Sequence, residues 1–335
     1  MKIAYVLESL EPSGGVKVIV EHAEGLAARG HDVSIVTRDA RHDWLPIRVP
    51  IVTVPHFDPE TLPEADVHVA TWFPTVVPVL RARRAPHIFH FSQGYEAFYS
   101  NVAHRLDEIA EAYRQPVPKI LISEHLRDVL IAERYPGPYF VVPQSVPVNE
   151  FRPEDARTGP RRPPVVGIVG PFEISLKGVP VALRAVRRLR ETGREILLHR
   201  ASQVPLTAEE HALAPSQRYD VCVAAGRMPA WYHELDLLLF ASEPGEGFGL
   251  PPLEAMAAGV PAVVTEIPSL RILPSDAVVR VKVGDDAALA REAARLLDDG
   301  ALWDARRKRG LEAASRFTLG PVLDRLEEIF GQKLS

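Results

Sequence analysis

The stretch from Glu246 to Thr265 constrains the fold more than any other part of this sequence. It reads Glu-Gly-Phe-Gly-Leu-Pro-Pro-Leu-Glu-Ala-Met-Ala-Ala-Gly-Val-Pro-Ala-Val-Val-Thr. The apolar run 235–240 before it predicts a buried strand, and the small residues of 244–249 predict a loop. Two prolines then suit the first turn of a helix, and a glycine followed by a proline predicts its end. Residues 262–265 predict a second strand, so the stretch is typical of an α/β fold.

The chemistry of this stretch follows from the glycine loop and the start of the helix. Such a loop leaves backbone N–H groups unpaired at the positive end of the helix dipole, which favours a phosphate group. Glu246 lies on the loop and Glu254 about one turn into the helix, so both can face one ligand, and carboxylates only accept hydrogen bonds. A nucleotide sugar has phosphates at its centre and hydroxyls at both ends. We therefore predict nucleotide-sugar binding by Glu246, Gly247, Phe248, Gly249, Leu250 and Glu254.

Two other interpretations of the stretch are weaker. In the first, the glutamates of a plain βαβ unit are solvated, which is the usual fate of this residue. In the second, Gly245, Gly247 and Gly249 bind a dinucleotide, with Glu266 as the downstream acid. Their spacing departs from the G-x-G-x-x-G pattern, and Glu246 would lie beside a pyrophosphate that repels it.

The motif E-G-F-G-L-x-x-L-E-A-M-A-x-G-x-P, with seven residues between Glu246 and Glu254, resembles the signature of the retaining family 4 glycosyltransferases. The resemblance implies the α/β GT-B fold, in which two Rossmann-like doubly wound domains face each other across a cleft. It also implies transfer of a sugar, with its anomeric configuration kept, from a UDP- or GDP-linked donor to a hydroxyl acceptor. That acceptor would be a glycan, a lipid-linked molecule or a small molecule.

Other functions fit the same motif. A sugar phosphorylase or a nucleotide-sugar epimerase would share the GT-B fold, and a non-catalytic nucleotide-sugar-binding protein would share the site. We expect no cofactor besides the donor substrate, and no residue cluster requires a divalent metal. No side chain stands out as a nucleophile. The front-face route of the family, in which a donor phosphate oxygen takes the acceptor proton, is therefore the simplest hypothesis.

Strands and helices alternate along both halves of the chain. The segment 152–164 is rich in Pro and Arg, lacks periodicity and predicts a linker. We expect residues 1–151 to form an acceptor domain and residues 165–317 to form the donor domain. The resemblance implies that a terminal helix within 318–335 crosses back to the first domain.

The first domain contains a second glycine loop. A strand at 3–7, a loop ending in Gly14 and Gly15, and a helical pattern of apolar residues predict a doubly wound sheet with ligands at the carboxyl ends of its strands. The glycines suit a tight turn or a backbone that approaches a sugar or phosphate closely. The matching loop in the family lies over the donor and the acceptor, so the resemblance favours a role for Gly14 and Gly15 in donor binding.

The predicted strand at 87–91 is followed by polar residues. Alternation places His90 and Ser92 on one face of the strand and Phe91 on the other. The resemblance implies a histidine here that contacts the donor sugar, and it aligns closer to Ser92 than to His90. A buried core position is the alternative for His90. The residues that follow the strand are candidate acceptor contacts: Gln93, Tyr95 and Glu96.

Lys177 and the glycine after it open a predicted helix of the second domain. The resemblance implies that this pair holds the donor diphosphate, and an ammonium is a suitable point charge for a leaving phosphate. Pro171 stands where the family carries an arginine, so Arg200 is a candidate substitute, with solvation as its alternative. The segment containing Met228 matches one that contacts the base in the family. Lys177, Glu246, His90 and Ser92 are the candidate catalytic residues.

Composition argues against several classes of protein. The formal net charge of −5 gives no reason to expect nucleic acid as a partner, and no apolar run approaches the ~20 residues that span a bilayer. The single cysteine, Cys222, excludes an internal disulfide, and its apolar neighbours predict a core position. We expect a cytoplasmic protein. Arg81, Arg83 and Arg84 predict a solvated helix face, with peripheral contact to an anionic inner membrane surface as the alternative.

Overall fold

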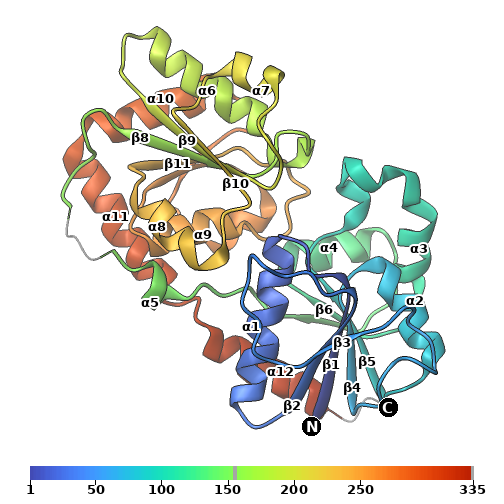
Figure 1. Cartoon of the computed structure of the whole chain (residues 1–335). Coiled ribbons are helices and arrows are strands. Elements are labelled where there is room, and N and C mark those ends of the chain that lie inside the picture. Colours follow the sequence, from blue (N-terminus) through green and yellow to red (C-terminus); the bar gives the residue numbers. More distant parts are fainter. Residues whose placement is uncertain (154–156, 333–335) are drawn as a thin grey trace. The chain divides into compact units, whose positions relative to one another are not determined.

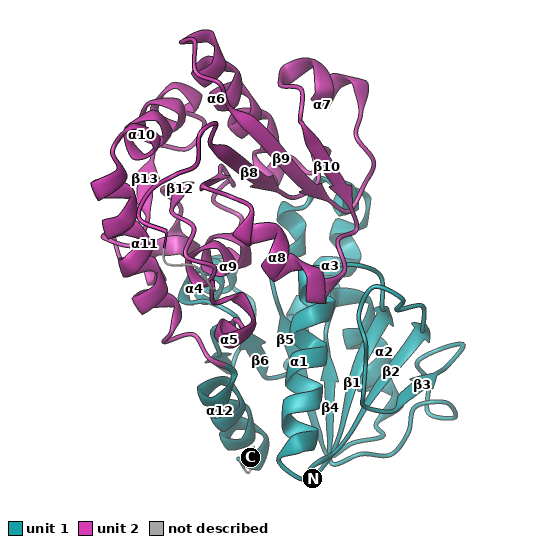
Figure 2. Cartoon of the chain, turned by 60° about the vertical axis from the view of Figure 1, so that its left-hand side comes forward, with its two compact units in different colours: residues 1–145, 319–335 teal, residues 146–318 magenta. Residues whose placement is uncertain are grey.

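The structure is a computed structural model that describes residues 1–153 and 157–332. The chain divides into two compact units (Figure 1), each built on one parallel sheet. Unit 1 comprises residues 1–145 and 319–335, and unit 2 comprises residues 146–318; Figure 2 colours them teal and magenta. Three residues of the predicted linker, 154–156, and the last three of the chain lie outside the described residues.

Unit 1 has a seven-stranded sheet in the order β3-β2-β1-β4-β5-β6-β7. Its elements are β1 (Lys2–Ser9), α1 (Gly14–Ala28), β2 (Asp32–Asp39), β3 (Ile51–Thr53), β4 (Val67–Ala70), α2 (Phe73–Ala82), β5 (His87–Ser92), the short 3-10 helices η1 (Glu96–Phe98) and η2 (Ser100–Arg105), α3 (Leu106–Arg114), β6 (Lys119–Leu121), α4 (Glu124–Ala132), β7 (Tyr139–Val141) and α12 (Leu319–Gly331).

Helices cover both faces of this sheet. On one face His22 of α1 contacts Phe91 of β5, with ring centroids 5.3 Å apart, and Phe330 of α12 contacts Phe89 at 5.2 Å. On the other face Tyr113 of α3 lies 4.8 Å from the ring of His90. The predicted alternation along β5 is therefore confirmed. The spacing of Val102, Leu106, Ile109 and Tyr113 predicts one helix over 97–114. The structure is α-helical only from Leu106, with the 3-10 helices η1 and η2 before it.

Unit 2 has a six-stranded sheet in the order β10-β9-β8-β11-β12-β13. Its elements are α5 (Val148–Phe151), β8 (Val165–Val169), η3 (Ser175–Lys177), α6 (Val179–Glu191), β9 (Leu197–Ser202), α7 (Ala208–Leu213), β10 (Arg218–Val221), η4 (Ala225–Arg227), α8 (Met228–His233), β11 (Leu237–Phe240), α9 (Leu250–Ala257), β12 (Ala262–Thr265), η5 (Pro268–Ile272), β13 (Val279–Val281), α10 (Asp286–Asp298) and α11 (Gly300–Ala314).

The main hydrophobic core of unit 2 lies between its sheet and two helices, α6 and α10, that pack together. On β11, the alternate residues Leu237 and Leu239 belong to this core. Helix α9 packs against β11 and β12, and α11 packs against α9. Arg157 and Arg161, from the predicted linker, both pair with the fully buried Asp236 just before β11. The described end of that segment is therefore fixed to unit 2.

Each sheet reverses its strand order once. In unit 1 the chain adds β2 and β3 on one side of β1 and then continues with β4 on the other side; in unit 2 the reversal lies between β8 and β11. Loops that leave the carboxyl ends of two such neighbouring strands diverge to opposite faces and leave a crevice, where ligands bind in doubly wound folds. This topology confirms the predicted fold class and brings the loop after β8 beside the loop after β11.

The core position predicted for Cys222 is wrong. Cys222 is exposed and follows β10, which forms one edge of the unit 2 sheet. Its neighbour Val221 is 46% exposed, and Cys222 itself has a φ of 50°, so the chain turns here rather than continuing into the core. An apolar run at a sheet edge does not require burial on both faces. None of the helices in the described ranges has the length and apolar character needed to cross a membrane.

Candidate active site

Lys177 and Glu246 meet at the strand-order reversal of unit 2. The Lys177 ammonium lies 2.8 Å from Oε2 of Glu246, and the Ser242 hydroxyl donates to the same oxygen at 3.1 Å. Lys177 comes from the loop after β8, and the other two come from the loop after β11. The side chains of Lys177 and Glu246 remain 29% and 11% exposed, so a ligand can reach this pair.

Close backbone contact holds these two loops together. The Glu243 N–H donates to the Leu176 carbonyl at 2.9 Å. Gly178 has a φ of 60°, and a Cβ placed on it would lie 1.9 Å from the Ala241 carbonyl oxygen. No other residue fits there, so the Lys-Gly pair seen in the sequence has a steric reason. The glycine lets the lysine loop approach the glutamate loop.

The start of α9 supplies backbone donors next to Glu246. Gly249 precedes the helix with a φ of 94°, and a Cβ there would meet a Leu270 side-chain carbon at 2.4 Å. Among the described residues, the N–H groups of Phe248, Gly249 and Leu250 have no hydrogen-bond acceptor. They therefore remain free to bind an anion at the positive end of the helix.

Glu254 lies on α9 and is 7% exposed. Its Oε2 accepts a hydrogen bond of 3.0 Å from the Tyr232 hydroxyl on α8, the helix that begins at Met228. Burial, together with the neighbouring carboxylate, raises the pKa of Tyr232 well above its usual value, so this hydroxyl stays a donor. Each predicted carboxylate is thus oriented by a partner that sequence reasoning missed, Ser242 for Glu246 and Tyr232 for Glu254. Only the place of Ser242 just after a predicted strand hinted at its role.

Arg200 is fully buried beneath the loop after β8. Its guanidinium pairs with Glu210 at 2.7 Å and donates to the carbonyls of Ile168 at 2.6 Å and Gly170 at 2.8 Å. The side chain of Lys177 in turn packs over Gly170, 3.5 Å from where a Cβ would lie. Arg200 therefore supports the loop that carries Lys177. Its predicted role as a second cation on the donor stays a prediction, and these bonds do not favour it.

Gly14 and Gly15 form the first turn of α1 in unit 1. Ser13 caps the helix, since its hydroxyl accepts from the Val16 N–H at 3.1 Å. No acceptor for the N–H groups of Gly14 and Gly15 occurs among the described residues. The Gln93 amide, from the end of β5, donates to the Gly15 carbonyl at 3.0 Å. The structure thus brings two predicted site regions of unit 1 together.

His90 and Ser92 are both fully buried in unit 1. Burial lowers the pKa of His90 to about 3, and its ring nitrogens have no hydrogen-bond partner among the described residues. The Ser92 hydroxyl donates to the Gly94 carbonyl at 2.9 Å and lies 2.7 Å from the Tyr113 hydroxyl. Their catalytic roles stay predictions, and the core alternative for His90 agrees with its burial.

Tyr95 and Glu96, two predicted acceptor contacts, lie in a buried cluster of tyrosines. The hydroxyls of Tyr95 and Tyr135 are 2.9 Å apart, and the Tyr113 hydroxyl donates to Oε2 of Glu96 at 2.6 Å. Burial raises the pKa of Glu96 to about 7, against the lowering effect of the Tyr113 bond. Both side chains are at most 6% exposed, so their contact with an acceptor stays a prediction.

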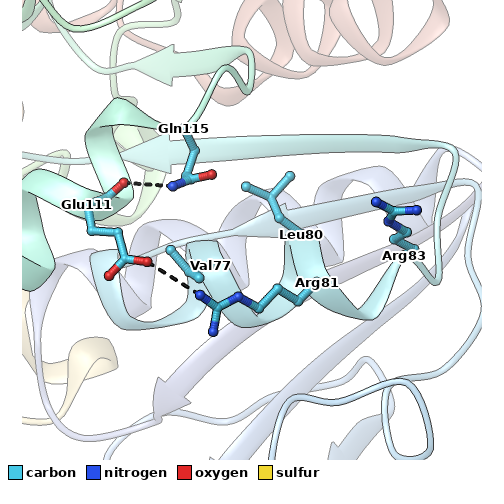
Figure 3. A pocket seen from close by; sticks show the side chains of 6 residues that line it. All are labelled: Val77, Leu80, Arg81, Arg83, Glu111 and Gln115. Carbon is cyan, nitrogen blue, oxygen red and sulfur yellow. Dashed lines mark hydrogen bonds and ion pairs between the residues drawn. The ribbon is translucent and has the colours of Figure 1, made fainter.

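A surface hollow of about 490 Å³ lies on α2 and α3 of unit 1 (Figure 3) and includes none of the predicted site residues. Its lining combines apolar and charged side chains, namely Val77, Leu80, Arg81, Arg83, Glu111 and Gln115. Arg81 pairs with Glu111 at 3.5 Å, and Arg84 nearby in sequence pairs with Glu64 at 3.0 Å. Two of the three arginines considered for a membrane contact are therefore partly neutralised.

Across the described ranges, no group of three or more His, Cys, Asp or Glu side chains is placed to hold a metal ion.

Part of the chain resembles known glycosyltransferases in sequence. Residues 163–299 match the family model described as "Glycosyl transferases group 1". The matched segment includes Lys177, Arg200, Glu246 and Glu254. Lipopolysaccharide core biosynthesis mannosyltransferase LpsB of Rhizobium meliloti is 39% identical over 93 residues, which are 27% of this chain and 26% of LpsB. D-inositol 3-phosphate glycosyltransferase of Xylanimonas cellulosilytica is 32% identical over 198 residues, 52% of this chain and 46% of that protein. This chain spans about half or less of the curated relatives it matches.

Solved structures match over nearly the whole chain. Anabaena HepE in complex with UDP and glucose superposes with a TM-score of 0.78 at 16% identity, covering 99% of this chain and 100% of that one. Sucrose-phosphate synthase from Thermosynechococcus elongatus gives a TM-score of 0.77 at 18% identity and covers 98% of each chain. At these identities the likeness shows the fold. That fold is the GT-B fold, and the match to the glycosyltransferase family model covers residues 163–299.

Proposed function

We propose that this protein is a retaining glycosyltransferase that moves a sugar from a nucleotide diphosphate sugar to a hydroxyl acceptor. The observation that carries the proposal is the partly exposed Lys177–Glu246 pair, 2.8 Å apart, directly before the free N–H groups at the start of α9. A cation and a helix N-terminus suit a diphosphate, and a carboxylate suits sugar hydroxyls. All of these groups lie in the segment that matches the glycosyltransferase family.

Each group has a role in this proposal. Lys177 and the N–H groups of Phe248, Gly249 and Leu250 stabilise the negative charge that develops on the leaving diphosphate. Glu246 accepts hydrogen bonds from hydroxyls of the donor sugar. Glu254, held by the Tyr232 hydroxyl, accepts from the ribose hydroxyls. We also propose that the protein belongs to glycosyltransferase family 4 and that Glu246 and Glu254 are the two glutamates of its E-x7-E motif.

The reaction needs no protein nucleophile. The bond between the anomeric carbon and the diphosphate oxygen breaks through an oxocarbenium-like transition state, and the acceptor oxygen bonds to the anomeric carbon on the same face. The acceptor proton passes to an oxygen of the leaving diphosphate, which keeps the charges balanced. Positive charge on that diphosphate therefore lowers the barrier directly, which is the role proposed for Lys177.

Relatives suggest which donors to test first. Anabaena HepE was crystallised with UDP-glucose, and two similar proteins are named as mannosyltransferases, LpsB and phosphatidyl-myo-inositol mannosyltransferase. UDP-glucose and GDP-mannose are therefore the first donors to try. Thermal-shift screening of UDP and GDP precedes them, because a ligand that binds the native state raises its stability by mass action.

The decisive test follows donor and product together. Purified protein is incubated with the best donor and a panel of glycan, lipid-linked and small hydroxyl acceptors, with and without EDTA. We expect a glycoside whose anomeric configuration, read from the one-bond C1–H1 coupling in NMR, matches that of the donor, and the same rate with EDTA. An inverted product, release of sugar 1-phosphate with inorganic phosphate, epimerisation of donor alone, or donor that binds but is never consumed would each overturn the proposal.

A further inference from the structure

The chain crosses between the two units twice, and the two crossings meet inside unit 2. This unit begins at Val146 and ends at Thr318, before α12 starts. We call residues 146–152 and 315–318 the crossing segments. The Val146 N–H donates to the Phe317 carbonyl at 2.8 Å. This bond joins the two crossing segments directly, although they are far apart along the chain.

The second crossing segment contacts the glycine loop of the candidate site. The rings of Phe317 and Phe248 lie edge to face, with centroids 6.3 Å apart and planes at 72°. The backbone N–H of Phe248 is one of the three at the start of α9 that have no acceptor in the described part of the chain. An edge-to-face contact is directional, because the positive edge of one ring meets the negative face of the other. Phe317 therefore restrains the part of the loop that presents these N–H groups.

The first crossing segment is connected to Glu254 through α8. Phe151, at the end of α5, has its ring 5.8 Å from that of Tyr232, and its carbonyl oxygen lies 2.7 Å from Nε2 of His233. A carbonyl only accepts, so Nε2 of His233 carries the hydrogen. The Tyr232 hydroxyl in turn donates to Glu254 at 3.0 Å. Each crossing segment therefore contacts, through one aromatic ring, a residue that carries or orients a group of the proposed donor site.

Both aromatic contacts lie in closely packed surroundings. Phe151 and Tyr232 are 1% and 0% exposed, and Phe248 is 2% exposed. Helix α5 packs against α8 and also against α9, the helix that carries Glu254. Packed interiors have low compressibility and transmit displacements to their neighbours. A shift in a crossing segment therefore reaches the loop at Phe248 and the carboxylate of Glu254.

We infer that Phe317 and Phe151 are positioning residues that couple the crossing segments to the donor site. Phe317 sets the position of the N–H groups that take the diphosphate, and Phe151 sets that of Glu254 through α8. This inference rests on the proposed function and adds to it two residues outside the stretch 246–265. Coupling between two sites is reciprocal, so nucleotide binding should in turn steady the crossing segments.

The first experiment compares Phe317→Leu and Phe151→Leu with Phe140→Leu, a control at a partly buried phenylalanine on β7, the edge strand of the unit 1 sheet. Titration calorimetry uses whichever of UDP and GDP binds the wild-type protein. We expect the affinity to fall about 2–10-fold in Phe317→Leu and in Phe151→Leu, the worth of one aromatic pair, and to stay at the wild-type value in the control. Phe317→Tyr keeps the ring and should restore the wild-type affinity.

Kinetics separates positioning from a general loss of structure. Phe317→Leu should raise the KM of the donor and lower kcat, about 2–10-fold each, because its loop meets the leaving diphosphate. Phe151→Leu should raise this KM alone, because Glu254 meets the ribose, which takes no part in bond breaking. The double variant Phe317→Leu with Phe248→Leu should lose no more affinity than Phe248→Leu, since both changes remove one shared contact. Additive losses would contradict the ring contact as the route of the coupling.

A third readout needs no sugar transfer. Hydrogen exchange of the amides in residues 148–152 should slow when the nucleotide saturates the wild-type protein or the control, but not Phe151→Leu. If leucine prevents folding at this buried site, His233→Ala, which removes the bond to the Phe151 carbonyl, takes its place. Wild-type affinity and wild-type slowing in the folded variants would overturn the inference. A wild-type protein that binds neither UDP nor GDP would instead overturn the proposed function, so the two failures are distinguishable.

Discussion

Two ion pairs of unit 2 have similar bond lengths but different surroundings. Lys177 and Glu246 are 2.8 Å apart with side chains 29% and 11% exposed, whereas Arg200 and Glu210 are 2.7 Å apart with both side chains 1% exposed. The Arg200 guanidinium also binds two backbone carbonyls and lies over the Tyr219 ring at 5.7 Å. A ligand can reach Lys177 and Glu246 and take the place of one of them as partner of the other, whereas Arg200 and Glu210 are closed to ligands.

The difference teaches what a cation needs in order to bind a substrate. A lysine ammonium has three donors, and the partial exposure of Lys177 leaves room for a phosphate oxygen next to Glu246. Arg200 spends its donors on Glu210 and on the loop that supports Lys177. In the proposed function the Lys177–Glu246 pair therefore serves the chemistry, and the Arg200–Glu210 pair supports the loop that carries Lys177. The predictions below test this division, from the largest effect to the smallest.

Arg200→Leu should lower the free energy of unfolding of the protein by about 3–5 kcal/mol, because it leaves Glu210 buried without its cationic partner. Urea unfolding measures the loss. The double variant Arg200→Met with Glu210→Met removes both charges at similar volume and should recover most of this loss. A stability loss in the double variant as large as in the single one would show that the charge pair is not the cause.

Lys177→Ala should lower kcat about 10²–10³-fold, the usual effect of removing one group that stabilises developing negative charge. Its unfolding free energy should change far less than that of Arg200→Leu, because the side chain is partly exposed. Steady-state kinetics and urea unfolding of the two variants, side by side, check both statements. Lys177→Arg keeps the charge and serves as the control. Turnover at the wild-type level would rule out the role of Lys177 on the leaving group.

Glu254→Ala should weaken nucleotide binding by about 1.5–3 kcal/mol, the worth of hydrogen bonds to a charged group. Titration calorimetry with UDP or GDP measures the affinity. Tyr232→Phe removes only the hydroxyl that orients Glu254 and should have a smaller effect of about 0.5–1.5 kcal/mol. Wild-type affinity in Glu254→Ala would contradict the ribose contact.

Glu96 is a buried carboxylate that has no cationic partner in the described part of the chain, whereas Arg200 pairs with Glu210. Its pKa is raised to about 7, so the folded state favours the protonated form. The stability that this proton contributes is fully present below the ordinary pKa of a glutamate and is lost as the pH rises through about 7. The unfolding free energy of the wild-type protein should fall between pH 5 and 8, and Glu96→Gln should reduce this fall by roughly 1–2 kcal/mol. An identical pH profile in the variant would count against a buried, protonated Glu96.

An exposed i,i+4 pair on α6, Arg187 and Glu191 at 3.7 Å, should contribute the least to stability of the ion pairs compared. Arg187→Ala should change the unfolding free energy by only about 0.3–0.5 kcal/mol, and less at high salt. Thermal unfolding at low and high ionic strength provides the measurement. A loss above about 2 kcal/mol would mean that the exposure of an ion pair does not predict its contribution to the unfolding free energy.

The sequence predicted the parallel α/β architecture because local patterns specify it. Apolar runs of four to six residues become buried strands, and the glycine, proline and cap positions around 246–265 specify one loop and one helix. The loops that carry Lys177 and Glu246 could be identified in the same way. Their pairing could not, because it depends on β8 and β11 being neighbours in the sheet although they are far apart along the chain.

The surroundings of other positions depend on tertiary context. Arg200 looked like a free cation at a strand end, and only the fold brings Glu210 of α7 onto it. Cys222 has apolar neighbours in sequence but lies at a sheet edge, where an apolar run need not be buried. Gln93 was singled out as a polar residue after a strand, yet its partners on α1 and near Val146 are distant in sequence. Composition and periodicity carry no information about such partners.

The return of α12 to unit 1 has a consequence for synthesis on the ribosome. Phe330 of α12 packs on Phe89 of the unit 1 sheet, and Glu327 of α12 accepts from Arg29 at 2.7 Å. The face of this sheet that α1 packs on is therefore fully covered only when α12 is in place. All of unit 2 is translated between the two parts of unit 1. The nascent first unit must therefore wait with an uncovered apolar face while the second is made, a stage at which a chaperone has most to protect.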